Sequence, residues 1–269
     1  MNRIDRLFRH REHPVLSIYF TAGFPRLQDT AAILAALQQS GADLVEIGIP
    51  YSDPLADGPV IQHSSMVALQ NGISIGQIFS QLRDFRKTIS LPVILMGYLN
   101  PVLQYGIERF CEDAANTGVD GLILPDLPLE EYESSYRKLF RKHGLYPIFL
   151  VTPETSDERI QKIDSLSRGF LYAVSSSSTT GTEKQLSGQQ PYFERLARLQ
   201  LKNPVMIGFG IRDHQGFVEA CRHASGAVIG TGYIRALEGA SDVSAATREF
   251  VHAILSADAV PGEILGEKN

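Results

Sequence analysis

Eight short apolar runs recur along the chain, and the stretches between them are more polar. The runs are rich in β-branched and other large apolar residues, which is typical of buried strands. Several of the intervening stretches repeat apolar residues with a period of about 3.6, as amphipathic helices do. The predicted strands cover residues 15–20, 44–49, 92–96, 121–124, 146–151, 170–174, 204–208 and 227–230.

Regular alternation of strand and helix predicts a parallel sheet. Eight such units in 269 residues fit one α/β domain over residues 1–269, a single (β/α)8 TIM barrel. An open doubly wound sheet is the main alternative. A nucleotide-binding version of it would carry a glycine-rich turn after its first strand, and Gly23-Phe24-Pro25 does not match that fingerprint. We expect an extra N-terminal helix, near residues 4–11, to cover the bottom of the barrel.

Composition narrows the class of protein. The net charge is −5, from 25 Lys and Arg against 30 Asp and Glu, which disfavours a dedicated nucleic-acid binder. The N-terminus lacks the apolar core of a signal peptide, and no apolar run approaches the ~18 residues that span a bilayer. We therefore expect a soluble, cytoplasmic protein.

Cysteine and histidine give no sign of a metal site. Cys111 and Cys221 lie on apolar helical faces and form no Cys-x-x-Cys pair, which favours buried, reduced thiols. The seven histidines show no spacing typical of metal ligands. We expect no metal in this chain.

Glu46 is a carboxylate in the middle of an apolar strand. Burying a carboxylate without a partner is costly, so such a residue is either paired or functional. The loop that follows contains three prolines and two further acids, Asp53 and Asp57. Prolines restrict the backbone and suit a loop that must hold a carboxylate in place. The alternative is a structural salt bridge for Glu46, with the loop aspartates acting as helix caps.

In (β/α)8 barrels the chemistry lies at the carboxyl ends of the strands. Tyr19 near the end of the first strand could line a pocket or fill the core. Asp126 after the fourth strand could be a site residue or a helix cap. The sixth strand, with Tyr172, runs into eight small residues at 175–182, which we interpret as a lid in preference to a disordered surface loop.

Glycines mark the ends of the last two strands, at Gly208-Phe209-Gly210 and Gly230-Thr231-Gly232. A short helical stretch follows the second of them. Glycines let a ligand approach the backbone, and a helix N-terminus offers free N–H groups. The placement of both motifs matches the usual phosphate site of such barrels. No phosphate loop of the nucleotide triphosphatases is present.

The run Glu-Ile-Gly-Ile-Pro-Tyr-Ser-Asp-Pro-Leu-Ala-Asp-Gly-Pro, residues 46–59, resembles the signature of the tryptophan synthase alpha chain family. The resemblance extends over nearly the whole chain. It implies a TIM barrel that cleaves indole-3-glycerol phosphate to indole and glyceraldehyde 3-phosphate in tryptophan biosynthesis. It also implies that this chain needs no cofactor of its own.

The resemblance also implies roles for individual residues. Glu46 corresponds to the general acid/base and Asp57 to the second catalytic acid. The implied substrate-binding residues are Tyr19 and Tyr172 for indole, Gly181, Gly210, Gly230 and Thr231 for phosphate, and Thr180 beside them.

A partner is implied as well: a beta chain that carries pyridoxal phosphate and joins indole to serine, in an alpha2-beta2 heterotetramer. Asp53 and Asn100 correspond to positions that face this beta chain. The loops at residues 53–59 and 175–187 correspond to two mobile active-site loops.

Three positions depart from the commonest family pattern. Tyr19 stands where Phe is frequent, and Gly230-Thr231-Gly232 replaces Gly-Ser-Ala. Gly232 is expected to loosen the start of the short helix. Ser178-Thr179-Thr180-Gly181 replaces Gly-Val-Thr-Gly in the expected lid. None of these changes removes a catalytic group.

The residues agree with the chemistry of a retro-aldol cleavage. The indole carbon must be protonated, the glycerol hydroxyl deprotonated, and the indole N–H stabilised; one buried Glu and a second carboxylate can supply these functions. Two alternatives remain: another phosphate-binding barrel of the same pathway, expected to place Lys or Cys at strand ends, and a non-catalytic barrel that activates a partner.

Overall fold

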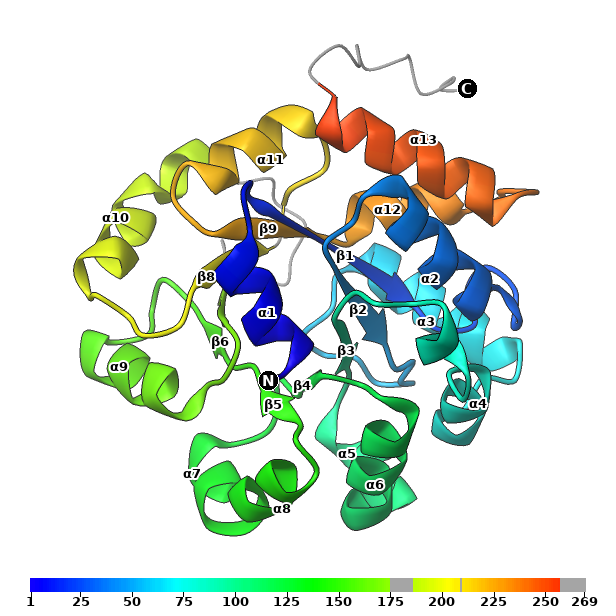
Figure 1. Ribbon diagram of the computed structural model, residues 1–269, viewed down its shortest axis with the longest axis horizontal. Helices are drawn as coiled ribbons and strands as arrows, with labels where there is room; N and C mark the ends of the chain where they lie inside the picture. The colour runs from blue at the N-terminus through cyan, green and yellow to red at the C-terminus, as the bar shows by residue number, and fades with distance from the viewer. Residues whose placement is uncertain (175–185, 209, 257–269) are drawn as a thin grey trace.

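The computed structural model describes residues 1–174, 186–208 and 210–256. In this part of the chain, nine strands form one parallel sheet in the order β5-β4-β3-β2-β1-β9-β8-β7-β6, with the helices around its outside (Figure 1). Every predicted run contains a strand, so the strand predictions are confirmed. The strands are β1 (Val15–Thr21), β2 (Leu44–Gly48), β3 (Val93–Met96), β4 (Gly121–Ile123), β5 (Tyr146–Pro147), β6 (Leu150–Val151), β7 (Leu171–Val174), β8 (Val205–Gly208) and β9 (Gly226–Ile229).

The predicted strand at residues 146–151 is observed as two strands of two residues, β5 and β6. Pro147 has no N–H to donate, which interrupts a continuous ladder. The Ile148 N–H donates to the Leu122 carbonyl of β4, and the Tyr172 N–H of β7 donates to the Phe149 carbonyl. Residues 146–151 therefore form both end strands of the order, β5 and β6, and the sheet curls round on itself.

Helices follow every strand except β5 and pack their apolar faces on the sheet. The last described helix, α13, lies beside α2, so two helices far apart in the sequence pack together (Figure 1). The α-helices are α1 (Arg3–His10), α2 (Asp29–Ser40), α3 (Pro59–Gln70), α4 (Ile75–Gln81), α5 (Leu99–Tyr105), α6 (Ile107–Thr117), α7 (Leu129–Glu131), α8 (Arg137–Lys142), α9 (Asp157–Leu166), α10 (Gln190–Arg198), α11 (His214–Cys221), α12 (Thr231–Leu237) and α13 (Val243–Leu255). Shorter helical turns are η1 (Phe85–Lys87), η2 (Tyr132–Tyr136) and η3 (Leu186–Gln189). No helix in the described part of the chain is long and apolar enough to cross a membrane.

The cysteines are both free thiols, but their environments differ. Cys111 is fully buried in α6, as predicted. Cys221 is only half-buried, so the prediction of a buried thiol is wrong at this position. It is the last residue of α11, where the helix end leaves it partly uncovered.

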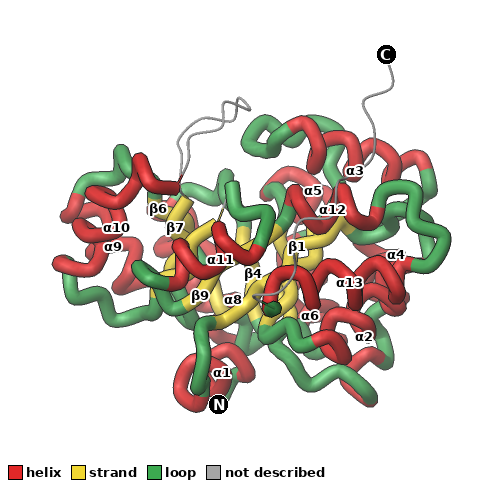
Figure 2. The backbone as a smooth tube through the Cα atoms, turned by 90° about the horizontal axis from the view of Figure 1, so that it is seen from above, coloured by secondary structure: helices red, strands yellow, loops and turns green. Residues whose placement is uncertain are grey.

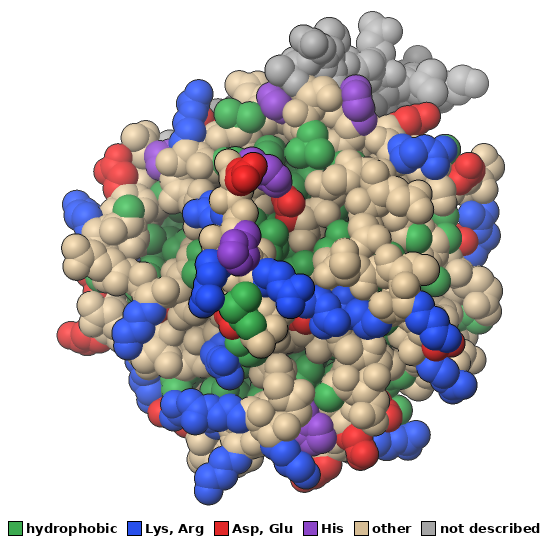
Figure 3. Space-filling model, in the orientation of Figure 1, with side chains coloured by type: hydrophobic (Ala, Val, Ile, Leu, Met, Phe, Trp, Pro, Cys, Tyr) green, Lys and Arg blue, Asp and Glu red, His purple; other side chains and the backbone are tan. Residues whose placement is uncertain are grey.

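Helix α1 covers the amino-terminal end of the sheet, opposite the expected site (Figure 2). Ile4 is fully buried there and packs closely against Gly169 and Gly121, where a Cβ atom would come within 2.8 and 3.3 Å of its side chain. Basic side chains gather on this face (Figure 3). Some of them form hydrogen bonds between distant parts of the chain: Arg11, for example, donates to the Ser225 carbonyl at 2.9 Å.

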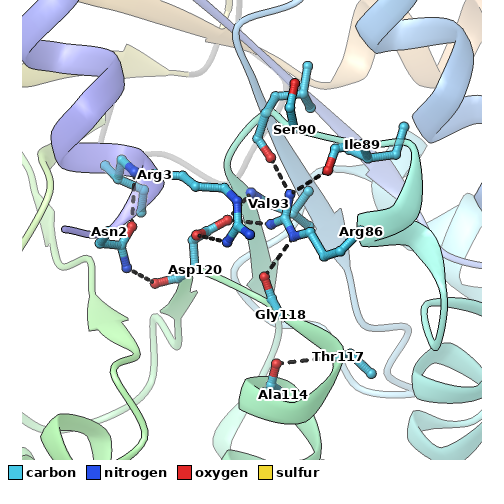
Figure 4. Close-up of polar contacts among 12 residues, drawn as sticks. Asn2, Arg3, Arg86, Ile89, Ser90, Val93, Ala114, Thr117, Gly118 and Asp120 are labelled. Carbon is cyan, nitrogen blue, oxygen red and sulfur yellow. Dashed lines mark hydrogen bonds and ion pairs between the residues drawn. The ribbon is translucent and has the colours of Figure 1, made fainter.

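Asp120, just before β4, is the centre of a buried polar cluster at this end (Figure 4). Its carboxylate accepts a hydrogen bond from Arg86 at 2.5 Å, from Arg3 at 3.1 Å and from the Val93 N–H at 2.9 Å. Asn2 donates to the Asp120 carbonyl at 2.9 Å. Strand β4, strand β3 and helix α1 are thus joined through one carboxylate.

Candidate active site

Glu46 lies at the middle of β2, opposite Tyr19 of β1 in the parallel register. Because side chains alternate along a strand, Ser17, Tyr19 and Glu46 share one face of this strand pair. Glu46 is fully buried. Its Oε1 accepts a hydrogen bond from the Ser17 hydroxyl at 3.1 Å, and its Oε2 is buried with no hydrogen-bond partner among the described residues.

Burial raises the pKa of Glu46 to about 8, against the opposing effect of the Ser17 hydrogen bond. Desolvation disfavours the charged form of a carboxyl group, and no cation among the described residues offsets it. Within these residues no ion pair includes Glu46, so they give no support to the structural salt bridge considered from the sequence. A carboxyl group in this state holds its proton at neutral pH and can donate it.

Asp57 lies in the proline-rich loop between β2 and α3 and is half-buried. Burial raises its pKa to about 6, while the Tyr98 hydroxyl favours the carboxylate as a hydrogen-bond donor. The same hydroxyl accepts from the Ala56 N–H at 3.0 Å, which fixes this part of the loop. Helix α3 begins at Pro59, its N-cap residue is Gly58 and no side-chain cap hydrogen bond is made there, so Asp57 is not a helix cap.

Two tyrosines lie across glycines of the neighbouring strands. A Cβ atom at Gly48 would come within 2.1 Å of the Tyr19 hydroxyl, and one at Gly208 within 2.2 Å of the Tyr172 hydroxyl. Only glycine therefore leaves room for these rings. Tyr19 and Tyr172 are 8% and 4% exposed, so both rings are buried.

The carboxyl groups of Glu46 and Asp57 raise the pKa of both tyrosines. Burial raises the pKa of Tyr19, and the Asp57 and Glu46 carboxyl groups add to this effect. The pKa of Tyr172 is raised by burial and then by Glu46, Tyr19 and Asp57. These four side chains, from β1, β2, β7 and the loop after β2, therefore converge on one place.

The two glycine-bearing strand ends also meet. Gly210 follows β8 with a φ of 79°, a left-handed conformation that favours glycine. Gly230 precedes α12, and a Cβ atom there would lie 3.3 Å from the Tyr19 ring. Gly232 faces the backbone of Arg212, where a Cβ atom would lie 3.3 Å from the carbonyl oxygen. Thr231 is the first residue of α12.

This geometry changes the interpretation of Gly232. From the sequence we expected a loosened helix start. The close approach of the Arg212 backbone shows a second role: the glycine allows tight packing between α12 and the segment after β8. Thr180, Gly181 and the rest of the expected lid at residues 175–182 lie outside the described residues.

Asp53 and Asn100 lie on an exposed rim near Asp57. Asn100 donates to the Tyr51 hydroxyl at 3.2 Å, and the Tyr51 ring packs on Tyr98 with centroids 5.3 Å apart. Leu55 in the same loop is 86% exposed, which is unusual for a large apolar side chain. The rim therefore combines polar groups with an uncovered apolar one.

Sequence reasoning missed two residues of this site, Ser17 and Tyr98, as contacts of the acids. The signal for Ser17 was a polar residue inside an apolar strand. Asp126 is a helix cap, one of its two predicted roles, but it caps a neighbouring helix: it accepts from the Leu99 N–H at the start of α5, at 2.8 Å. In the part of the chain that the structure describes, no group of three His, Cys, Asp or Glu could hold a metal ion.

Comparison with known proteins identifies the family of the chain. Residues 7–258 match the family model described as tryptophan synthase alpha chain. The alpha chain of Flavobacterium psychrophilum is 49% identical over 247 residues, covering 91% of this chain and 97% of the relative. That of Christiangramia forsetii is 51% identical over 236 residues, covering 87% and 92%.

Solved structures give the same result. The alpha subunit of Legionella pneumophila has a TM-score of 0.84 at 39% identity, covering 94% of this chain and 97% of that one. A tryptophan synthase chain from M. tuberculosis has a TM-score of 0.81 at 30% identity, covering 94% and 100%. The chain therefore belongs to the tryptophan synthase alpha chain family, the lyases that cleave indole-3-glycerol phosphate.

Proposed function

We propose that Glu46 and Asp57 perform the cleavage of indole-3-glycerol phosphate at the carboxyl ends of the strands. One observation carries the proposal: two carboxyl groups converge on the same two buried tyrosines, and burial raises their pKa values to different extents. The pKa of Glu46 is raised to about 8, and that of Asp57 only to about 6. At pH 7 Glu46 therefore holds a proton and Asp57 is mostly ionised. Groups whose pKa values are pushed apart in this way are typical of acid/base pairs.

The proposed cycle uses Glu46 twice. Protonated Glu46 gives its proton to carbon 3 of the indole ring. The resulting carboxylate takes the proton from the hydroxyl on the adjacent glycerol carbon. The carbon–carbon bond then breaks, its electrons return to the ring, and the hydroxyl carbon becomes the aldehyde. Glu46 is protonated again at the end, so the cycle consumes no acid.

Asp57 would stabilise the positive charge that develops on the indole nitrogen after ring protonation. A carboxylate placed where charge develops lowers the barrier without rearranging during the reaction. Tyr98 and Ala56 hold the Asp57 loop in the described structure. Tyr19 and Tyr172 would line the indole pocket, consistent with their convergence on both acids.

The phosphate would bind at Gly210, Gly230 and Thr231, together with Thr180 and Gly181. Support comes from the contact of Gly230 with Tyr19 and of Gly232 with Arg212, which joins the two glycine-bearing ends beside the pocket. Holding the phosphate at a distance from the reacting bond would position that bond against Glu46.

For the scaffold we propose a closed (β/α)8 barrel in a single domain. The segment at residues 146–151 supports closure, because it bonds to β4 on one side and β7 on the other. In such a barrel, β5 and β6 are two halves of one strand, and β9 is the eighth strand. Helix α12 is then the short phosphate-binding helix that follows it.

We further propose that the chain works in the cytoplasm with a beta chain, as an alpha2-beta2 complex. The exposed Leu55, with Asp53 and Asn100 beside it, would form part of the contact. Pyridoxal phosphate would be bound by the beta chain alone.

Indole release from indole-3-glycerol phosphate by the purified chain tests the proposal, measured alone and with a beta chain. We expect release in both cases and faster turnover in the complex, because a partner on the rim would hold the Asp57 loop closed. A correctly folded chain that releases no indole in either condition would overturn the lyase assignment. Equal turnover with and without the bound beta chain would overturn only loop ordering by the partner.

A further inference from the structure

Ser17 is a fully buried serine in the middle of β1, where the adjacent residues Leu16 and Ile18 are apolar and fully buried. Burying a hydroxyl costs free energy unless it is hydrogen-bonded. Its hydrogen bond goes to Oε1 of Glu46, at 3.1 Å. The parallel register places Ser17 opposite Leu44, two residues before the Tyr19–Glu46 pair. The serine therefore reaches Glu46 from the amino-terminal side of the strand pair.

The two oxygens of Glu46 are consequently not equivalent. Oε1 is occupied by Ser17, whereas Oε2 is buried and has no partner among the described residues. We propose that Ser17 is a positioning residue, which holds Oε1 so that Oε2 exchanges the proton with the substrate. The inference rests on the proposed function, in which Glu46 is the acid/base residue.

The hydroxyl should also influence how readily Glu46 gives up its proton. A donor to a carboxylate favours the charged form. Ser17 accordingly lowers the pKa of Glu46, while burial raises it. A serine that only filled space would stabilise the fold but would leave the titration of Glu46 unchanged.

The first test is the pH dependence of kcat for indole release. In the proposed cycle Glu46 starts protonated, so its pKa sets the alkaline limb of the profile. Ser17→Ala should move that limb to higher pH by about one pH unit, since a hydrogen bond to a charged group is lost. Ser167→Ala removes the hydroxyl of another buried serine and serves as the control. Its profile should match the wild type.

An isosteric pair separates the hydroxyl from packing. Ser17→Thr and Ser17→Val have nearly the same shape and differ by one hydroxyl group. Both carry the same steric change, so their fold, checked by circular dichroism, should be affected alike. The threonine variant should keep the wild-type limb and the valine variant should show the shift. Coinciding profiles for Thr, Val and wild type would overturn the proposal, even if Ser17→Ala does not fold.

An infrared titration follows Glu46 without activity. The carbonyl band of its protonated carboxyl group, identified by its absence in Glu46→Gln, should persist to higher pH in the valine than in the threonine variant. The same midpoint in both would show that Ser17 does not act on Glu46. If Glu46→Gln itself still releases indole, the proposed function fails. The infrared midpoints would even then decide whether Ser17 controls this carboxyl group.

Discussion

Glu46 and Asp120 are two buried carboxyl groups of one sheet, and their surroundings are opposite. Asp120 at the amino-terminal end is 3% exposed and contacts two guanidinium groups, from Arg3 and Arg86. Glu46 is fully buried, and in the part of the chain that the structure describes its one hydrogen-bond partner is the Ser17 hydroxyl. Burial lowers the pKa of Arg86 to about 10, and Asp120 opposes that effect. Among the described residues, nothing comparable compensates Glu46.

From this difference we expect Asp120 to contribute mainly to stability and Glu46 mainly to the reaction. Asp120 joins β3, β4 and α1, and removing its charge would leave two arginines without a counter-ion. The Glu46 carboxyl group, by contrast, accepts a hydrogen bond from Ser17 of the neighbouring strand β1. Its buried environment favours a bound proton over a negative charge. In (β/α)8 barrels, stability is commonly built at the amino-terminal face and reactivity at the carboxyl-terminal face.

The largest expected effect is the loss of cleavage in Glu46→Gln. Removal of a general acid/base typically costs ~10²–10⁴-fold in rate. The fold should be intact, because an uncompensated buried acid is replaced by a neutral amide of the same shape. Steady-state indole release and circular dichroism measure both. Glu133→Gln, at an exposed residue paired with Lys162, is the matched control. Near wild-type turnover in folded Glu46→Gln would remove Glu46 from the mechanism.

Asp120→Asn should show the opposite pattern. Breaking a buried ion pair by removing one partner costs about 3–5 kcal/mol of stability. Urea denaturation should show this loss, while kcat per folded molecule stays close to wild type. Asp84→Asn, which breaks only the exposed pair with Lys87, should barely change the midpoint. A stable but inactive Asp120→Asn would contradict the separation between the two ends.

Asp57→Asn should reduce turnover by about 10²-fold, because an amide cannot balance the charge on the indole nitrogen. The loss should appear in kcat and not only in KM, which initial rates over a range of substrate concentrations resolve. A change confined to KM would make Asp57 a binding residue.

A phosphate ligand should stabilise wild type and Asp120→Asn by the same amount. Glycerol 3-phosphate at ~100 times its dissociation constant should add about 2.7 kcal/mol to the free energy of unfolding. Because the sites are distant, the same increment should appear in wild type and in Asp120→Asn. Soaked crystals should place the phosphate at Gly210, Gly230 and Thr231. Protection without density there would refute this location.

The backbone was largely predictable from the sequence, because apolar periodicity reports burial directly. All eight runs contain strands, and α1 begins at Arg3, one residue before its predicted start. The exception is residues 146–151, where the run was correct but Pro147 divides the observed strand. Glu46 was also identifiable, since an acid inside an apolar strand is rare without a reason.

The contacts of these residues were not predictable. The hydrogen bond from Ser17 to Glu46 depends on the register between β1 and β2, and a shift of one residue would turn every side chain to the other face. Tyr98 reaches Ala56 across 42 positions of the sequence, and Asp126 caps a helix that begins 27 residues earlier. Such contacts arise only when strand order brings the loops together.

Burial should keep Glu46 protonated at neutral pH, and pH-dependent unfolding tests this expectation most directly. The folded chain retains a proton at Glu46 that the unfolded chain releases above its ordinary pKa of 4.5. The Glu46 contribution to stability is therefore complete below pH 4.5 and is lost as pH rises toward about 8. Urea denaturation of wild type and Glu46→Gln should give unfolding free energies whose difference changes in favour of Gln by up to ~1.4 kcal/mol per pH unit in this window and levels off above it. Other groups contribute equally to both proteins and cancel. Parallel curves across this window would contradict the account.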